Sequence, residues 1–181
     1  KAAPTVMLKL AQTDWKEDVL KVADIMQKKE KAEAWLADYK KKAREKGQEI
    51  KKSYGKNKSY LSILASGGQI FVYDKAGIGS ILYEDMGLKR PKGLPEQKDI
   101  SLPVVSYEGL ASIEADYILA IGTKDDMAAL KKNSVWKELP AVKKGHVAEL
   151  PASPYFNQGY SSIGRLSFLD EVNGLMEKMN E

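Results

Sequence analysis

The 181-residue sequence contains no cysteine and a single histidine, His146. The lack of cysteine excludes disulfides, thiolate nucleophiles and cysteine metal sites from this chain. A zinc site made of protein ligands alone would need three carboxylates beside the histidine, which is an unusual ligand set. The motifs Gly-x-Ser-x-Gly, His-Glu-x-x-His and a phosphate loop ending in Gly-Lys-Ser/Thr are also missing. We therefore expect no catalytic residue, no metal site and no intrinsic cofactor.

Long apolar runs are equally scarce. The longest ones are far shorter than the roughly 20 residues that a membrane-spanning helix needs. Lys1-Ala2-Ala3-Pro4 is not followed by an apolar stretch of signal-peptide type. This pattern carries little weight if the sequence begins inside a longer precursor.

Positive charge is in slight excess and is concentrated in one segment. Residues 40–58 hold nine Lys or Arg and two Glu, whereas the rest of the chain holds 20 basic and 23 acidic residues. No aromatic residue interleaves with the basic cluster before Tyr54, as a stacking surface for nucleic acid would need. We interpret the cluster as a solvated helix face and expect no nucleic-acid partner; a nucleic-acid module using this helix is the alternative.

The N-terminal region predicts a lone strand over 4–10 and then a short helix capped by Thr13 or Asp14. A long helix follows over 29–53, in which Trp35, Tyr39 and Ala43 recur every four residues and the other faces are charged. So narrow an apolar stripe favours a helix that lies along a surface or bridges two bodies. Gly47 should weaken this helix by roughly 1 kcal/mol relative to Ala.

From residue 54 onward the pattern alternates between strands and helices. Gly67-Gly68 predicts a hairpin turn between two apolar runs, and Gly87 predicts the end of a helix over 77–86. Strands and helices of these lengths favour an α/β, Rossmann-like and mostly parallel sheet that helices cover on both faces. Its strands are expected at Tyr60–Ala65, Ile70–Tyr73, Tyr117–Ile121 and His146–Leu150.

The segment 151–161 is the most informative candidate site. We expect it to be a loop between the carboxyl end of a strand and a helix capped by Ser161, which is where ligands bind in open α/β sheets. Its aromatic, amide and hydroxyl side chains suit an amphipathic ligand. A well-packed loop is the plainer interpretation. An enzyme domain using this crevice would need a histidine or a carboxylate pair, and the nearest acid, Glu149, stands alone.

A second glycine-rich stretch, Gly77-Ile-Gly79-Ser80, precedes a predicted helix. Amides at such a position can face an anion. The stretch lacks the third glycine of a dinucleotide-binding fingerprint, so we do not expect a nucleotide cofactor.

The order of these parts resembles that of a known family. The stretches that carry the likeness are Glu30-Lys-Ala-Glu-Ala-Trp-Leu-Ala-Asp-Tyr39, Ile70-Phe-Val-Tyr73, Ile113-Glu-Ala-Asp-Tyr-Ile-Leu-Ala120 and Trp136-Lys-Glu-Leu-Pro-Ala-Val-Lys-Lys-Gly-His-Val147. In this order they resemble the C-terminal half of the iron-siderophore and cobalamin binding proteins of ABC importers, which have the class III periplasmic-binding-protein architecture. The resemblance covers essentially the whole chain.

The resemblance implies a division into three parts: residues 1–28 as the tail of an N-terminal lobe, 29–53 as an interlobe linker helix and 54–181 as the C-terminal ligand-binding lobe. It also implies a monomeric solute-binding protein, not an enzyme, that captures a ferric siderophore between two lobes and delivers it to the membrane permease. Such a protein is extracytoplasmic, as a cell-surface lipoprotein or in the periplasm. A heme- or cobalamin-binding relative is the alternative.

The resemblance further implies where contacts lie. Glu84, with Asp85 as a close second, matches the acidic residue that docks onto arginines of the permease. Ligand contacts are expected near the strand ends and in the 101–106 loop. The expected ligand-binding residues are Ser66, Gln69, Phe71, Tyr155, Phe156, Asn157, Gln158 and Tyr160.

One departure from the family pattern bears on the ligand. Many relatives that bind anionic ferric siderophores carry Arg after the first strand of this lobe, where this chain reads Ala65-Ser-Gly-Gly-Gln69. Neither Arg90 nor Arg165 is an obvious substitute. The sequence therefore favours a hydroxamate-type or otherwise less charged ferric complex over a tris-catecholate, whose negative charge would want basic partners. His146, in a Lys-Gly-His turn, is a poor axial ligand for heme.

Overall fold

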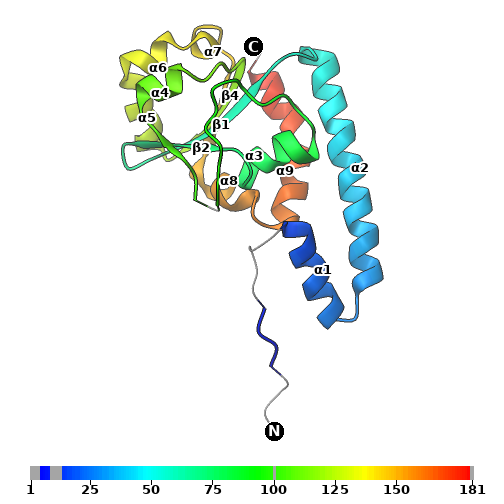
Figure 1. Ribbon diagram of the computed structural model, residues 1–181. Coiled ribbons are helices and arrows are strands. Elements are labelled where there is room, and N and C mark those ends of the chain that lie inside the picture. The colour runs from blue at the N-terminus through cyan, green and yellow to red at the C-terminus, as the bar shows by residue number, and fades with distance from the viewer. Residues whose placement is uncertain (1–4, 9–13, 100, 180–181) are drawn as a thin grey trace. The chain divides into compact units, whose positions relative to one another are not determined.

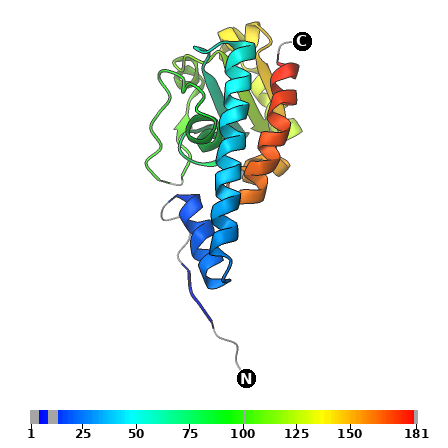
Figure 2. The same ribbon diagram turned by 90° about the vertical axis from the view of Figure 1, so that its right-hand side faces the viewer.

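The computed structural model describes residues 5–8, 14–99 and 101–179, and Figures 1 and 2 show it from two directions. The chain forms two compact units, Lys1–Tyr39 and Lys40–Glu181, which are described separately below. The division falls within α2 (Lys29–Tyr54), a single 26-residue helix. This helix confirms the long helix predicted over 29–53.

The first unit holds α1 (Trp15–Ile25) and the start of α2. Asp14 caps α1, because its carboxylate accepts a hydrogen bond from the Lys16 amide at 3.1 Å. An aromatic cluster joins the two helices: the Trp15 ring meets Tyr39 edge-on with centroids 5.1 Å apart, and Trp35 stacks on Tyr39 at 5.5 Å. The four-residue spacing of Trp35 and Tyr39 therefore marks a packed face.

The strand predicted over 4–10 is not formed by residues 5–8, which have no regular secondary structure. Residues 4, 9 and 10 lie outside the described residues. A strand is stable only when its backbone N–H and C=O groups pair with a neighbouring strand. No described strand pairs with residues 5–8.

The second unit is built on a five-stranded sheet in the order β3-β2-β1-β4-β5. The β1–β4 and β4–β5 pairs are parallel, whereas β2 runs antiparallel to both β1 and β3. Four strands therefore point the same way and β2 is reversed, which confirms the predicted α/β sheet. The strands are β1 (Tyr60–Ser66), β2 (Gln69–Tyr73), β3 (Val104–Val105), β4 (Tyr117–Gly122) and β5 (Val147–Pro151).

Helices cover both faces of this sheet, as Figure 1 shows. On one face, strand residues such as Leu61, Ile63 and Ile118 form a buried core with Leu110 and Trp136. The helices on that face are α4 (Tyr107–Ala111), α5 (Lys124–Lys132), α6 (Ser134–Glu138) and α7 (Pro140–Lys143). The other face is covered by α3 (Gly77–Ser80), which continues into η1 (Ile81–Asp85), and by α8 (Ala152–Gln158) and α9 (Ser162–Lys178).

The turn and cap signals of this unit are confirmed. Gly67 and Gly68 have φ of 57° and 79°, as a two-residue hairpin turn between β1 and β2 requires. Helix α5 begins with a further cap, a capping box between Thr123 and Asp126. Ser161 caps α9 by accepting a hydrogen bond from the Gly164 amide at 3.0 Å.

The helix predicted over 77–86 is real but irregular, because α3 continues into the π-helix η1 before Gly87 ends it with φ of 69°. Its glycines serve packing. A Cβ added at Gly159 would lie 2.2 Å from the carbonyl carbon of Gly77, so the two backbones touch. Gly77 and Gly79 are also buried, so this glycine-rich stretch packs inside the lobe.

The part of α2 that belongs to the second unit packs more closely than its sequence predicted. Ala43, Gly47 and Ile50 are buried, and a Cβ on Gly47 would lie 2.0 Å from the Met86 carbonyl oxygen. Gly47, predicted as a weak point of the helix, is therefore the residue that allows this close approach. Figures 1 and 2 both show α9 running beside α2.

Candidate ligand-binding site

A pocket of about 600 Å³ opens at the carboxyl ends of the parallel strands. Strands β1 and β2 supply one wall and α8 supplies the other. Leu64 and Phe71 are direct partners across the β1–β2 pair, so their side chains lie on the same face of the sheet. Its lining residues are Leu64, Ser66, Phe71, Leu102, Ala152, Ser153, Phe156, Asn157 and Tyr160.

The aromatic wall of this pocket is open to solvent. Phe156 is 42% exposed and Tyr160 is 40% exposed, and their ring centroids lie 6.5 Å apart. Burial of its hydroxyl raises the pKa of Tyr160, so this group stays neutral near pH 7. None of the described lining residues carries a charge. The pocket therefore offers apolar contact and a few uncharged hydrogen-bonding groups.

Helix α8 positions this wall, and it corrects the loop predicted over 151–159. The chain turns into a helix at Ala152 with a kink at Ser153, and Pro154 sits in the first turn, where a missing N–H does no harm. The Ser, Pro and Gly content of the segment suggested a loop. The contact of Gly159 with Gly77 holds the carboxyl end of α8 against α3.

Five of the eight expected ligand-binding residues line this pocket: Ser66, Phe71, Phe156, Asn157 and Tyr160. The other three lie elsewhere. Gln69 is exposed at the start of β2, and Gln158 is buried on α8. Tyr155 is also buried, and its hydroxyl donates a hydrogen bond to Glu171 Oε2 at 2.6 Å.

Four lining residues were not among the expected ones, although Leu102 falls in the expected 101–106 loop. Leu64 could have been found from strand alternation, since it lies two residues before Ser66 on the same face of β1. Ala152 and Ser153 lie at the start of α8, where the Ser153 backbone is not helical (φ −98°, ψ 126°). Helical spacing would therefore not have predicted them.

The two arginines considered as substitutes for a cleft arginine are both engaged inside the lobe. Arg165 is buried, donating to Asp85 Oδ2 at 2.8 Å and to the Ser80 hydroxyl at 2.7 Å. Arg90 donates to Asp74 Oδ1 at 2.7 Å and to the Leu94 carbonyl at 3.1 Å. Neither residue lines the pocket. The sequence Ala65–Gln69, which lacks an arginine, predicted a neutral cleft, and the described residues that line the pocket are indeed all uncharged.

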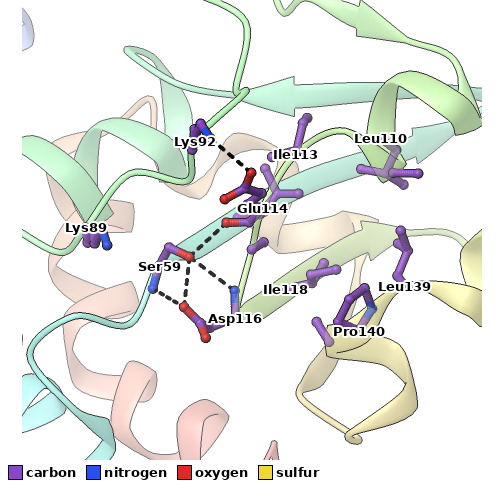
Figure 3. Close-up of a pocket in the computed structure, with 14 residues that line it drawn as sticks. Ser59, Lys89, Lys92, Leu110, Ile113, Glu114, Asp116, Ile118, Leu139 and Pro140 are labelled. Atoms are coloured by element: carbon purple, nitrogen blue, oxygen red, sulfur yellow. Dashed lines mark hydrogen bonds and ion pairs between the residues drawn. The ribbon is translucent and has the colours of Figure 1, made fainter.

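A second pocket, of about 550 Å³, lies at the opposite, amino ends of β1 and β4 (Figure 3). Its polar groups already bind one another. The Ser59 amide donates to Asp116 Oδ2 at 2.9 Å, and its hydroxyl donates to the Glu114 carbonyl at 3.0 Å. Lys58 pairs with Asp116 at 2.9 Å, and Lys92 pairs with Glu114 at 3.3 Å. Few polar groups remain here to bind a ligand.

His146, predicted to be solvated, is half-buried beside this second pocket. Its ring stacks on Tyr117 with centroids 4.5 Å apart and planes 14° apart, and Nδ1 lies 3.1 Å from the Asp116 carbonyl oxygen. The histidine thus packs against strand β4. Among the described residues, no group of three or more His, Asp or Glu side chains is arranged to hold a metal ion.

The predicted enzyme alternative finds no support at the candidate site. Glu149, the nearest acid, pairs with Lys131 at 2.8 Å and does not line the pocket. Across the described residues, no helix is both long enough and apolar enough to cross a bilayer.

Together, a mixed α/β lobe and an uncharged aromatic pocket at its carboxyl-end edge form the candidate ligand-binding site. Residues 1–154 match the periplasmic binding protein family model. The chain belongs to this family.

The curated proteins that match this chain include two that are named as binding proteins for iron uptake. The chain is 35% identical over 180 residues to the iron(3+)-hydroxamate-binding protein FhuD of Bacillus subtilis, covering 94% of this chain and 56% of that protein. It is 30% identical over 176 residues to the iron-uptake system-binding protein of the same organism, covering 93% and 54%. The chain thus spans just over half the length of these relatives.

Solved structures agree with this assignment. A FhuD fold-family periplasmic binding protein component of a Fep/Fec-like ferrichrome ABC transporter from Bacillus subtilis superposes with a TM-score of 0.80 at 29% identity, covering 99% of this chain and 66% of that one. FhuD2 from Staphylococcus aureus with bound ferrioxamine B gives 0.79 at 25% identity, covering 98% and 69%. The resemblance drawn from the sequence is confirmed.

Proposed function

We propose that this chain is the C-terminal ligand-binding portion of a solute-binding protein that captures ferric siderophores for an ABC importer. Ligand would be held between two lobes, of which residues 54–181 form one, with 29–53 as the linker helix and 1–28 as the tail of the other. The protein would act as an extracytoplasmic monomer, as a lipoprotein or in the periplasm. The mechanism is capture and delivery, without catalysis.

The uncharged aromatic pocket is the observation that carries this proposal. A ferric siderophore arrives with its iron already coordinated, so the protein needs no metal-binding side chains of its own. The large organic shell of the complex needs apolar area, which Phe71, Phe156 and Tyr160 supply, and a few hydrogen bonds, which Ser66 and Asn157 can make. The 35% identity to an iron(3+)-hydroxamate-binding protein supports the same ligand class.

The lack of charge in the lining favours a hydroxamate-type complex. A ferric tris-catecholate retains negative charge, and anionic ligands gain most from arginine forks. Arg90 and Arg165 are bound to Asp74 and Asp85 and are not placed to supply them. We therefore propose that hydroxamates are preferred.

Titration of the complete encoded protein with ferrioxamine B and with a ferric tris-catecholate tests this function. We expect saturable quenching of the protein fluorescence by ferrioxamine B and weaker binding of the catecholate. If neither complex binds, the proposed function is wrong. If the catecholate binds more tightly, the ligand class is wrong while the transport role stands.

Glu84 is the better of the two candidates for docking on the permease. It is exposed at the end of η1, whereas Asp85 is buried and paired with Arg165 at 2.8 Å. Docking requires a carboxylate that a partner's arginine can reach. Asp85 instead joins η1 to α9 inside the lobe.

The two neighbours should therefore respond differently to substitution. Glu84→Ala should abolish most siderophore uptake by cells, leave the ligand affinity unchanged and, because the side chain is exposed, change the free energy of unfolding by less than about 1 kcal/mol. Asp85→Ala should lower the free energy of unfolding by about 3–5 kcal/mol, because it leaves the Arg165 charge buried without its partner. Uptake assays and denaturant melts of both variants provide the check. Normal uptake by Glu84→Ala would remove this residue from the docking surface.

A further inference from the structure

The second unit carries an unpaired basic surface on α2 and the turn after it. Three of the nine basic residues of segment 40–58 have carboxylate partners: Lys42 with Asp170, Lys46 with Glu49 and Lys58 with Asp116. The other six form no ion pair with any described residue. We call these six the basic face: Lys40, Lys41, Arg44, Lys51, Lys52 and Lys56.

Helix geometry places the basic face on one side. At 3.6 residues per turn, positions 40, 41, 44, 51 and 52 fall within about one third of the helix circumference. The buried side of this part of α2 holds Ala43, Gly47 and Ile50. The side next to α9 is neutralised, because Lys42 pairs with Asp170 and Glu49 accepts a hydrogen bond from Asn173 at 2.9 Å. The unpaired charges therefore lie on the side away from α9.

Several of these charges converge. A Cβ built at Gly87 would lie 2.6 Å from Arg44 Nη1 and 3.7 Å from Lys51 Nζ, so both cationic groups reach over the same glycine. Lys51, Lys52 and Lys56 also line one shallow hollow with Gln48 and Gly55. Like charges held this close repel one another unless an anion lies between them.

The helix dipole explains only part of this arrangement. Cations in the last turn of a helix, such as Lys51 and Lys52, interact favourably with its negative end. Lys40, Lys41 and Arg44 lie about three to four turns before that end, where this effect has faded. The whole chain carries a net charge of +4, which would be −2 without the six residues of the basic face. The positive excess of the molecule is thus confined to one side.

We propose that the basic face binds the anionic headgroups of a phospholipid membrane and orients the lobe on it. The one aromatic residue within its span, Tyr54, packs edge-on against Tyr117 with ring centroids 6.0 Å apart. The face therefore suits a layer of many phosphates better than a nucleic-acid strand that needs stacking. The choice of a lipid surface rests on the extracytoplasmic, membrane-associated role proposed above. The unpaired charges themselves do not depend on that role.

Co-sedimentation of the 181-residue chain with lipid vesicles tests this proposal. The vesicles are phosphatidylcholine alone or phosphatidylcholine with one third phosphatidylglycerol. The test variant is Arg44→Gln/Lys51→Gln/Lys52→Gln, in which glutamine preserves helix propensity. The matched control is Lys132→Gln/Lys137→Gln/Lys144→Gln, which removes the same charge from exposed lysines outside the basic face.

We expect the wild type to bind the anionic vesicles and not the neutral ones, with binding that weakens as salt is added. Each basic residue near an anionic surface contributes about fivefold in partitioning, so the test variant should bind roughly a hundredfold more weakly. The control should change less than about threefold. Titration of the complete encoded protein carrying either set of substitutions with ferrioxamine B should give unchanged affinity, which separates this surface from the pocket.

Three outcomes would overturn the proposal. The wild type could fail to bind anionic vesicles at low salt. Both triple variants could lose binding equally, which would mean that only net charge matters. A DNA duplex could compete for the protein at a lower phosphate concentration than the vesicles, which would assign the face to nucleic acid. Failure of the complete encoded protein to bind ferrioxamine B would instead refute the proposed function and leave the vesicle result standing.

Discussion

The two ends of the sheet carry hollows of similar size but different chemistry. At the amino ends of β1 and β4, Ser59, Lys58 and Asp116 bind one another. At the carboxyl ends, Phe156 and Tyr160 stand 42% and 40% exposed in an uncharged lining. The hollows measure about 550 and 600 Å³, so volume does not distinguish them. What distinguishes the candidate binding site is therefore that its side chains are exposed and are not already bonded to other residues of the protein.

Removal of the aromatic wall should break the carboxyl-end site. In Phe156→Ala/Tyr160→Ala, we expect the affinity for ferrioxamine B to fall about a hundredfold, because large aromatic side chains dominate such contacts. The free energy of unfolding should change little, since both side chains are already partly exposed. Calorimetric titration and thermal melts measure the two quantities.

The control for this experiment is Tyr155→Phe. Tyr155 neighbours Phe156 but faces the interior, where its hydroxyl donates to Glu171. The substitution should lower the free energy of unfolding by about 1 kcal/mol and leave the affinity unchanged. An equal loss of affinity in Tyr155→Phe would mean that the helix, and not its exposed face, governs binding.

Substitutions in the hydrogen-bonded group at the amino ends of β1 and β4 should lower stability without changing ligand affinity. Asp116→Ala removes the acceptor of the Ser59 amide and the partner of Lys58, so we expect the free energy of unfolding to fall by about 2–3 kcal/mol. Ligand affinity should stay the same. Glu114→Ala, which loses only an exposed pair with Lys92, should cost less than about 1 kcal/mol. A drop in affinity for Asp116→Ala would contradict the division between the two ends.

The same comparison predicts a smaller, pH-dependent difference. Burial alone would raise the pKa of Asp116, but hydrogen bonds from the Ser59 amide, Lys58 and the Ser59 hydroxyl outweigh it and hold the pKa below its ordinary value of 3.8. A carboxylate with a lowered folded-state pKa stabilises the fold at neutral pH, and this contribution is lost as the pH falls below about 3.8.

Denaturant melts across acidic pH measure this contribution. The free energy of unfolding should fall more steeply in the wild type than in Asp116→Asn. Affinity for ferrioxamine B should stay nearly constant between about pH 5 and 8, because the described pocket lining holds no carboxylate or imidazole. A sharp change of affinity in that range would show that a titratable group outside the described lining contacts the ligand.

Much of this site could be predicted from composition, but the orientation of its side chains could not. The segment 151–161 was selected because aromatic, amide and hydroxyl residues gather there, and the pocket lies beside it. The prediction included too many residues of this segment, because a segment interpreted as a loop gives no indication of which side chains face the pocket. In the structure, α8 turns Phe156 and Asn157 toward the pocket, the turn after α8 adds Tyr160, and Tyr155 and Gln158 are buried.

The predictions for Gly47 and for Glu84 and Asp85 also missed contacts between segments that are far apart in the sequence. Gly47 has low helix propensity, and its benefit arises only from the Met86 carbonyl of a segment 39 positions later. Glu84 and Asp85 are chemically similar neighbours, and only the packing of Arg165 decides which one is buried. Periodicity and caps are local properties and were predicted well. Contacts between distant segments decide the rest.

The location of bound iron tests the central claim most directly. A crystal of the complete protein grown with ferrioxamine B would place the iron by its anomalous scattering. We expect the iron at the carboxyl-end pocket, held only by the siderophore, with the organic shell in contact with Phe156 and Tyr160. Iron bound beside Ser59 and Asp116, or coordinated directly by protein side chains, would contradict the assignment of this lobe.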